Sequence, residues 1–289
     1  METSKYLVTS TCRLSDCDPS DISLFRDREE AEKRLEACRF LLAELQDKMY
    51  AQAGFSVLVI LQAMDTAGKD GVVKHVFSGV NPQGVRVVSF KKPSTEELQH
   101  DYLWRVSEQL PKLGEIGVFN RSYYEDVLVT RVHSGMINPA LLPSGRADET
   151  FWNQRLEQIN QYERYLLQNR IIPIKLFLHI SKQEQKKRLL ARIGNKSKNW
   201  KFDQADIQER QYWSDYQRVY EKTISATASE QAPWYVIPAN KKWYARAIVA
   251  QILTERIEKL HPDYPQITKE QAAVLARCKR LLEDEPQEA

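Results

Sequence analysis

The sequence predicts an α/β protein with a five-stranded parallel sheet and helices on both faces. Two observations predict this fold class. Short apolar runs alternate with longer segments of helical periodicity along the 289-residue chain, an order typical of parallel strands joined by helical crossovers. The first apolar run, residues 56–62, is dominated by leucine and β-branched residues, as expected of a strand that is buried on both faces.

The elements follow in order from the N-terminus. Residues 1–22 are polar and irregular, so we expect a flexible arm there and a single domain over residues 23–289. Apolar residues at steps of three and four predict an amphipathic helix over 25–50. Further strands are expected at 85–90, 116–120, 172–179 and 234–237. Further helices are expected from residue 69, then at 94–110 after a capping-box pair, and at 148–170, 182–193, 204–227, 241–260 and 268–283.

The segment after the first strand has the layout of a phosphate-binding loop. Small residues lead to Gly68 and Lys69, where a helix is expected to begin. Backbone N–H groups at a helix N-terminus, together with a lysine, bind phosphate. The full pattern is GxxxxGK[ST], but Ala63 replaces its first glycine and Asp70 replaces the Ser/Thr. An ordinary strand–turn–helix with an incidental lysine would also fit this segment.

Charged clusters follow three of the predicted strands. They are residues 65–69, the pair Lys91 and Lys92, and residues 120–126, Asn-Arg-Ser-Tyr-Tyr-Glu-Asp. Because parallel strands end at the same edge of a sheet, we expect these clusters to converge. Lysine and arginine neutralise a transferring phosphoryl group, and carboxylates hold Mg²⁺. The sequence therefore favours phosphoryl transfer.

The basic residues are unevenly distributed. The net charge of +3 is too small to argue for nucleic-acid binding. Residues 181–201, however, contain eight basic residues and one acidic residue, and such a local excess indicates a site for a polyanion. A solvated helix face is the alternative explanation.

Cysteines, histidines and hydropathy exclude several other classes. Cys12 and Cys17 lack the CxxC spacing of zinc or redox sites, and the five histidines show no ligand spacing. No apolar run is long enough to span a membrane, and the N-terminus lacks the apolar core of a signal peptide. We expect a cytoplasmic protein with reduced thiols and no membrane partner.

Five motifs carry a resemblance to a known family. They are residues 64–71 (MDTAGKDG), 120–128 (NRSYYEDVL), 131–133 (RVH), 198–202 (KNWKF) and 232–239 (APWYVIPA). Over about residues 25–260 the chain resembles the polyphosphate kinase 2 family, whose loop pattern is GxDxxGKxG. Ala63 departs from this pattern too, and residues 137–150 look like an insertion.

The resemblance implies a fold, an activity and a set of site residues. The implied fold is a three-layer α/β/α sandwich, a P-loop kinase of the thymidylate kinase type with a helical lid at about 181–205. The implied activity is reversible, Mg²⁺-dependent phosphate transfer between inorganic polyphosphate and nucleoside mono- and diphosphates. The implied metal residues are Asp65 and Asp126. The implied catalytic residues add Lys69, Asn120, Arg121 and Arg188. The implied phosphate-binding residues are Ala67, Gly68, Lys69, Asp70, Gly71, Lys74, Lys91, Lys92, Arg131, Arg188, Arg192 and Lys201.

The residue at position 120 helps to predict which nucleotides accept the phosphate. Asn120 followed by Tyr-Glu-Asp-Val-Leu resembles the subgroup that accepts both mono- and diphosphates, whereas many diphosphate-specific members have Asp at this position. A neutral asparagine also adds no negative charge beside the incoming phosphate. We therefore expect both AMP and ADP to be accepted.

Two alternatives remain open at this stage. An ATP-dependent nucleoside monophosphate kinase needs the same loop and lid, but basic residues that extend away from the loop favour a chain-like donor. A non-enzymatic nucleic-acid binder would use the basic lid and some of the six tryptophans. We expect no nucleic-acid partner, and we expect a homo-oligomer, either a dimer or a tetramer.

Overall fold

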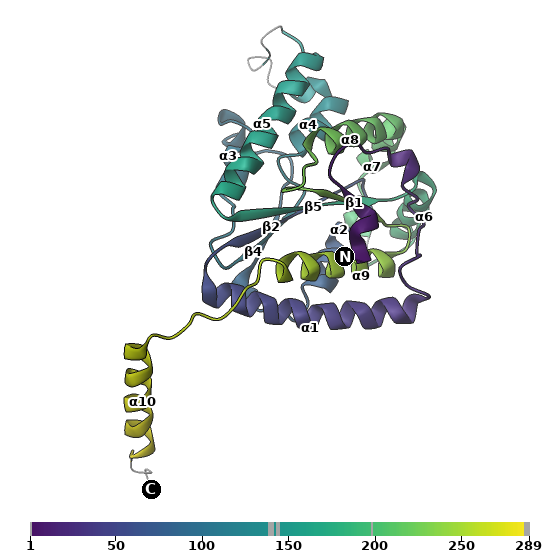
Figure 1. Ribbon diagram of the computed structural model, residues 1–289. Helices are drawn as coiled ribbons and strands as arrows, with labels where there is room; N and C mark the ends of the chain where they lie inside the picture. The colour runs from purple at the N-terminus through teal and green to yellow at the C-terminus, as the bar shows by residue number, and fades with distance from the viewer. Residues whose placement is uncertain (1, 138–141, 143–144, 198, 286–289) are drawn as a thin grey trace.

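The predicted parallel sheet is present in the structure, with one additional strand. The computed structural model describes residues 2–137, 142, 145–197 and 199–285. Six strands pair in the order β1-β6-β5-β2-β4-β3 (Figure 1). The five expected strands are parallel: β2 (Ser56–Ala63), β3 (Val85–Ser89), β4 (Ile116–Asn120), β5 (Ile171–His179) and β6 (Trp234–Pro238). The sixth, β1 (Leu7–Val8), pairs antiparallel with β6.

Strand β2 forms the centre of the sheet. Every residue of β2 is buried, because β5 flanks it on one side and β4 on the other. The register pairs Leu61 with Asn120. The C-terminal ends of β2 and β4 therefore lie side by side, and this brings the first and third charged clusters together.

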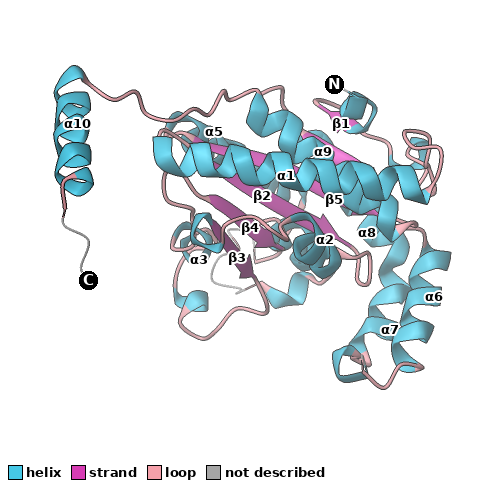
Figure 2. Cartoon of the chain, turned by 90° about the horizontal axis from the view of Figure 1, so that it is seen from below, coloured by secondary structure: helices cyan, strands magenta, loops and turns pink. Residues whose placement is uncertain are grey.

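Helices cover both faces of the sheet, which confirms the α/β/α sandwich (Figure 1). One face carries α1 (Arg28–Gln52), α2 (Lys69–Val76) and α9 (Lys242–Glu258). The other carries α4 (Glu125–Val132), α5 (Glu149–Gln168) and α8 (Trp213–Thr227). Helices α6 (Lys182–Ile193) and α7 (Ala205–Glu209) project from the body near α2 (Figure 2). None of the helices in the described ranges has the length and apolarity needed to cross a bilayer.

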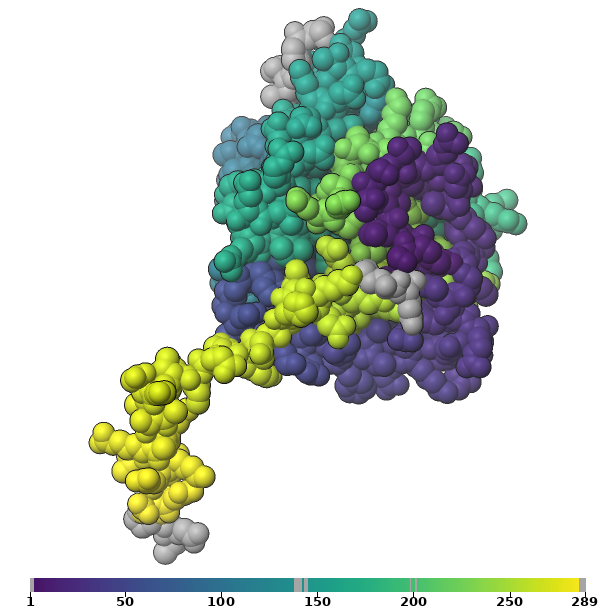
Figure 3. Space-filling model, viewed as in Figure 1, coloured from purple at the N-terminus to yellow at the C-terminus, as the bar shows by residue number. Residues whose placement is uncertain are grey.

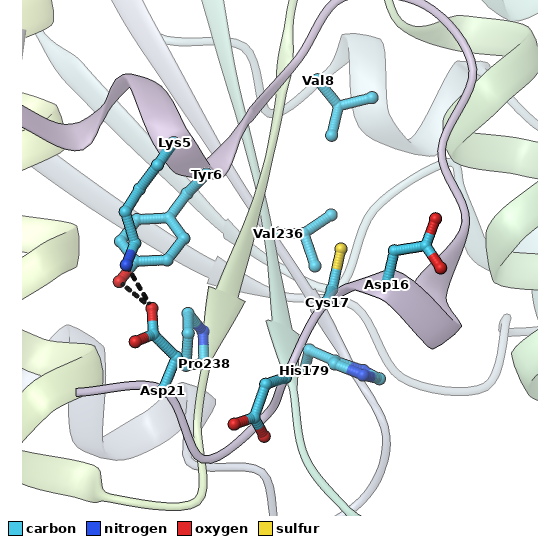
Figure 4. Close-up of a pocket in the computed structure, with 10 residues that line it drawn as sticks. Lys5, Tyr6, Val8, Asp16, Cys17, Asp21, His179, Val236 and Pro238 are labelled. Carbon is cyan, nitrogen blue, oxygen red and sulfur yellow. Dashed lines mark hydrogen bonds and ion pairs between the residues drawn. The ribbon is translucent and has the colours of Figure 1, made fainter. Parts of the chain in front are cut away.

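The N-terminal segment differs from the flexible arm that its composition suggests. Tyr6, Cys12 and Leu14 are buried in the core, and the Tyr6 hydroxyl donates to Asp21 Oδ2 at 2.8 Å. The segment lies over the ends of β5 and β6 and lines a cavity of about 330 Å³ there (Figure 4). A few well-spaced apolar residues are therefore enough to anchor an otherwise polar segment.

Several helices are shorter than expected or stand apart. Ser94 and Glu97 do form reciprocal caps, but they begin only a 3₁₀ turn, and α3 (Trp104–Ser107) is a single turn. The helix expected over 204–227 is divided into α7, a 3₁₀ turn and α8. Helix α10 (Lys269–Glu283) has no buried residue and extends away from the domain (Figures 1 and 3).

Candidate active site

The loop between β2 and α2 has an unusual backbone. Gly68, the residue before α2, has φ +120°, which a side chain would strain. Thr66 also lies in the left-handed region, with φ 62°. Strained backbone of this kind persists at ligand-binding loops because the surroundings hold it in place. The loop thus directs the N-terminus of α2 toward the edge of the sheet where ligands bind.

Lys69 is held against the start of the loop. Its Nζ donates to the carbonyl oxygen of Ala63 at 2.9 Å. Burial, with a smaller effect from the Arg121 charge, lowers the pKa of Lys69 to about 8. Ala63 itself is the last, buried residue of β2 and is not among the residues with positive φ. In this conformation the position needs no glycine.

Arg121 lies between two carboxylates. It has φ 66°, and its Nη2 donates to Asp65 Oδ1 at 3.0 Å while Nη1 lies 3.5 Å from Glu125 Oε2. In the amide orientation that satisfies both ends, Gln62 donates to Glu125 Oε1 at 2.8 Å. Burial raises the pKa of Glu125, while the charges of Arg121 and Lys69 oppose that rise. Two cations and two carboxylates therefore converge at the loop.

Glu125 is the carboxylate that contacts Arg121 beside Asp65, whereas the motif assigned the second metal carboxylate to Asp126, and that assignment stays a prediction. Burial raises the pKa of Asp126 to about 6, and the charges that oppose this rise belong to Arg105 and Arg155. Adjacent residues in a helix point about 100° apart, so only one of the pair can face Arg121. Helical spacing could not have identified the contact of Arg121 with Glu125, because Arg121 lies before α4 begins and has a left-handed backbone conformation.

Asn120 joins the end of β4 to the first turn of α2. Its Nδ2 donates to Asp70 Oδ1 at 3.0 Å. The side chain at residue 120 is therefore also a positioning group for the helix that begins the phosphate site, beyond the role in acceptor choice that we expect from the motif.

Arg188 differs most from its expected place in a mobile lid. It is buried, and its guanidinium donates to the carbonyls of Thr66 (3.0 Å), Ala67 (2.7 Å), Ala239 (2.6 Å) and Asn240 (3.1 Å). Its Nε also donates to Glu184 at 2.9 Å. Arg188 therefore stabilises the loop between β2 and α2 by hydrogen bonds to its backbone carbonyl oxygens.

Helices α6 and α7, in the segment where a lid is expected, are connected to each other. Arg192 on α6 forms a 2.9 Å ion pair with Asp206 on α7. Burial, followed by the negative charge of Asp65, raises the pKa of Asp206. Helix α7 therefore lies close enough to the loop for the two carboxylates to affect each other.

The remaining predicted cations are more scattered. Lys74 is exposed on α2, and Lys91 and Lys92 are exposed after β3. Arg131 is engaged by Glu149 at 2.6 Å, in the region between α4 and α5. The side chain of Lys201, and residues 138–141, 143 and 144 of the expected insertion, lie outside the described residues.

The donor set at the loop fits Mg²⁺. The described residues hold no group of three or more His, Cys, Asp or Glu side chains suited to a metal. Mg²⁺ does not need such a cage, because it commonly takes one or two carboxylates and completes its shell with water and phosphate oxygens. Asp65 and Glu125, on either side of Arg121, are the residues that would hold it.

A central parallel strand that leads into a lysine-bearing phosphate loop, beside an arginine and two carboxylates, defines a kinase-type P-loop phosphotransferase. Comparison with known proteins identifies the family. The family model for polyphosphate kinase 2 (PPK2) matches residues 25–265, and the chain belongs to that family.

Similar proteins agree with this assignment. An ADP-polyphosphate phosphotransferase from Rhodopseudomonas palustris is 51% identical over 243 residues, covering 84% of this chain and 82% of the relative. An AMP/ADP-polyphosphate phosphotransferase from Meiothermus ruber is 48% identical, covering 86% and 90%. The crystal structure of polyphosphate kinase 2 from Arthrobacter aurescens superimposes with a TM-score of 0.88 at 41% identity, covering 96% of both chains.

Proposed function

We propose that this protein transfers phosphate reversibly between inorganic polyphosphate and nucleotides, converting AMP to ADP and ADP to ATP with Mg²⁺. The observation that carries the proposal is the placement of Lys69 and Arg121 at one loop with Asp65 and Glu125. Cations neutralise a transferring phosphoryl group, and the carboxylates suit a divalent metal.

The reaction exchanges one phosphoanhydride bond for another. An oxygen of the nucleotide's last phosphate bonds to the terminal phosphorus of polyphosphate. The bond to the next phosphate breaks, and the shortened chain leaves with the electron pair. Asp65 and Glu125 would hold Mg²⁺, which would offset the negative charge of the phosphates during transfer. The backbone N–H groups at the start of α2 and Lys69 would bind the terminal phosphate, while Arg121 orients the carboxylates.

The acceptor range is the finer part of the proposal. The motif at residues 120–128 supports AMP as well as ADP, and the relative from Meiothermus ruber carries both nucleotides in its name. Asn120 contacts Asp70, so an aspartate at 120 would face another carboxylate. We therefore expect Asn120→Asp to lower both stability and activity, as well as to change the ratio of AMP to ADP turnover.

A nucleotide panel tests the proposal. The purified protein is incubated with Mg²⁺ and AMP, ADP, GMP or GDP, using polyphosphate or ATP as donor, and products are separated chromatographically. We expect AMP and ADP to be phosphorylated from polyphosphate. Phosphorylation of AMP from ATP alone would instead identify a nucleoside monophosphate kinase. A homo-oligomeric state and a cytoplasmic location stay predictions.

A further inference from the structure

A buried ion pair joins α5 to β5 on the face of the sheet that carries α4, α5 and α8. Lys175 in β5 and Glu163 on α5 are both buried, and Lys175 Nζ donates to Glu163 Oε2 at 2.6 Å. Lys175 Nζ also donates to the carbonyl oxygen of Thr227 at 2.6 Å. Replacing such a pair by apolar side chains of similar volume is often neutral or stabilising, because burying the two charges costs free energy. Stability alone therefore does not explain why these two residues are charged.

The other carboxylate oxygen of Glu163 holds two tyrosines. Glu163 Oε1 accepts from Tyr123 Oη at 2.9 Å and from Tyr124 Oη at 2.7 Å. Both tyrosines are almost completely buried. Burial, followed by the charge of Glu163, raises the pKa of each tyrosine well above its ordinary value, so both hydroxyls stay protonated and donate. Lys175 thus offsets the charge of a carboxylate that fixes two neighbouring aromatic side chains.

These tyrosines belong to the segment that carries part of the candidate site. Arg121 comes two residues before Tyr123, and Glu125 follows Tyr124 directly. Helix α4 begins at Glu125 with Tyr124 as its N-cap, and the Tyr124 ring packs edge to face against Trp234 with their centroids 4.8 Å apart. Because adjacent residues of a helical turn point about 100° apart, fixing the Tyr124 ring in the core also fixes the direction of Glu125.

We propose that Glu163 and Lys175 are positioning residues for phosphate transfer. Acting from the core through the two tyrosines, they hold Arg121 and Glu125 in the orientation in which Arg121 contacts both Glu125 and Asp65. The inference rests on the proposed function, because the residues that the pair positions are those proposed to act on the transferring phosphate.

Two double variants separate the acceptor from the charges. Lys175→Met with Glu163→Gln (the Gln variant) keeps an oxygen that accepts from the tyrosines, whereas Lys175→Met with Glu163→Leu (the Leu variant) removes it. We expect the Leu variant to lower kcat about tenfold or more, since misplacing a reacting group by about 1 Å can cost about 100-fold. The Gln variant should recover most of this loss. The KM for ADP should stay near the wild-type value in both, as for an interaction that acts only in the transition state.

A third variant tests the hydrogen bonds without disturbing the ion pair. Tyr123→Phe with Tyr124→Phe (the Phe variant) keeps both rings and both charges, and it should lower kcat as the Leu variant does. The control is Glu157→Gln, at an exposed position on the same helix, which should keep the wild-type kcat. Melting temperatures verify that each protein is folded.

Two results would overturn the positioning role. One is a wild-type kcat in the folded Phe variant, and the other is an equal loss of kcat in the Gln and Leu variants. Either would show that the pair contributes to the core only. Absence of transfer from polyphosphate by the wild-type protein would instead overturn the proposed function.

Discussion

At the scale of single residues, the site is an arrangement of two cations and two carboxylates held by their own contacts. Arg121 contacts both Asp65 and Glu125, and Lys69 lies against the Ala63 carbonyl. Burying any one of these charges without its oppositely charged neighbours would cost more free energy than burying the whole group. Removing one member should therefore affect the others, as in other coupled active sites.

The first prediction separates the two neighbouring carboxylates. Glu125→Gln should lower kcat about 100-fold or more, the scale seen when one preorganised polar group of an active site is removed. Asp126→Asn should lower it less than about tenfold, because that side chain is held near Arg105 and Arg155. Steady-state rates with polyphosphate and ADP measure both. A larger loss of kcat in Asp126→Asn than in Glu125→Gln would favour Asp126, the residue assigned from the motif.

The second prediction concerns pH. Because the pKa of Lys69 is lowered to about 8, the free enzyme loses this positive charge as the pH rises above that value. The kcat/KM for polyphosphate, which reports the free enzyme, should fall on the alkaline side with an apparent pKa near 8. In Lys69→Arg the side chain stays charged, so any remaining activity should lack this decline. An unchanged alkaline limb in that variant would assign the titration to another group.

Motifs predict residue types better than side-chain directions. Asp65, Lys69, Asn120 and Arg121 all meet at the loop, as the strand ends predicted. Which of Glu125 and Asp126 contacts Arg121 depends on the direction in which the first residues of α4 point, and α4 begins at Glu125. The bracing role of Arg188 depended on carbonyls from loops far apart in sequence, and no local pattern reports these.

At the scale of elements, Arg188 links three segments: the loop after β2, the start of α6 and the turn between β6 and α9. The third prediction is that Arg188→Ala lowers the free energy of unfolding by more than about 2 kcal/mol, since buried carbonyls lose their donor. Polyphosphate binding should weaken with it.

Lys187→Ala, at an exposed neighbouring position, is the control for Arg188→Ala in thermal and denaturant unfolding. A loss of kcat in Arg188→Ala with wild-type stability would show that the arginine acts on the transferring phosphate, as expected of a lid arginine.

The fourth prediction concerns the N-terminal segment. Deleting residues 2–22 removes β1 and the buried Tyr6, Cys12 and Leu14. Burial of one large apolar side chain contributes about 1.5–3 kcal/mol, so the truncated protein should melt at a clearly lower temperature. Ser10→Ala, at an exposed position, should melt like the wild type. Equal melting temperatures for the truncated and full-length proteins would show that the segment is a loose arm.

Strands were easier to predict than helix lengths. Strands β2, β4, β5 and β6 are mostly apolar runs, because they are largely buried on both faces. Strand β3, at the edge of the sheet, is partly exposed and was recognised by its alternating valines. The helices over 94–110 and 204–227 are interrupted, because their capping and periodic signals are local while tertiary contacts decide where helices end.

At the scale of the whole molecule, the fold brings separate sequence motifs to one edge of the sheet. Strands β2 and β4 end side by side. Helices α6 and α7 project near the same edge (Figure 2), and the ion pair of Arg192 with Asp206 joins these two helices. The convergence of these motifs indicates phosphoryl transfer, and membership of the polyphosphate kinase 2 family indicates polyphosphate as the donor. Helix α10, which leaves the domain, contributes nothing to the described site.

Phosphate transfer from polyphosphate to a nucleotide without ATP is the central claim, and ³¹P NMR measures it most directly. The protein is mixed with AMP, polyphosphate and Mg²⁺, and the spectrum is followed with no ATP present. The account predicts growth of the ADP β-phosphate signal at the expense of internal polyphosphate phosphates, and much slower growth with Glu125→Gln. A spectrum in which AMP stays unchanged while the folded protein is present would contradict it.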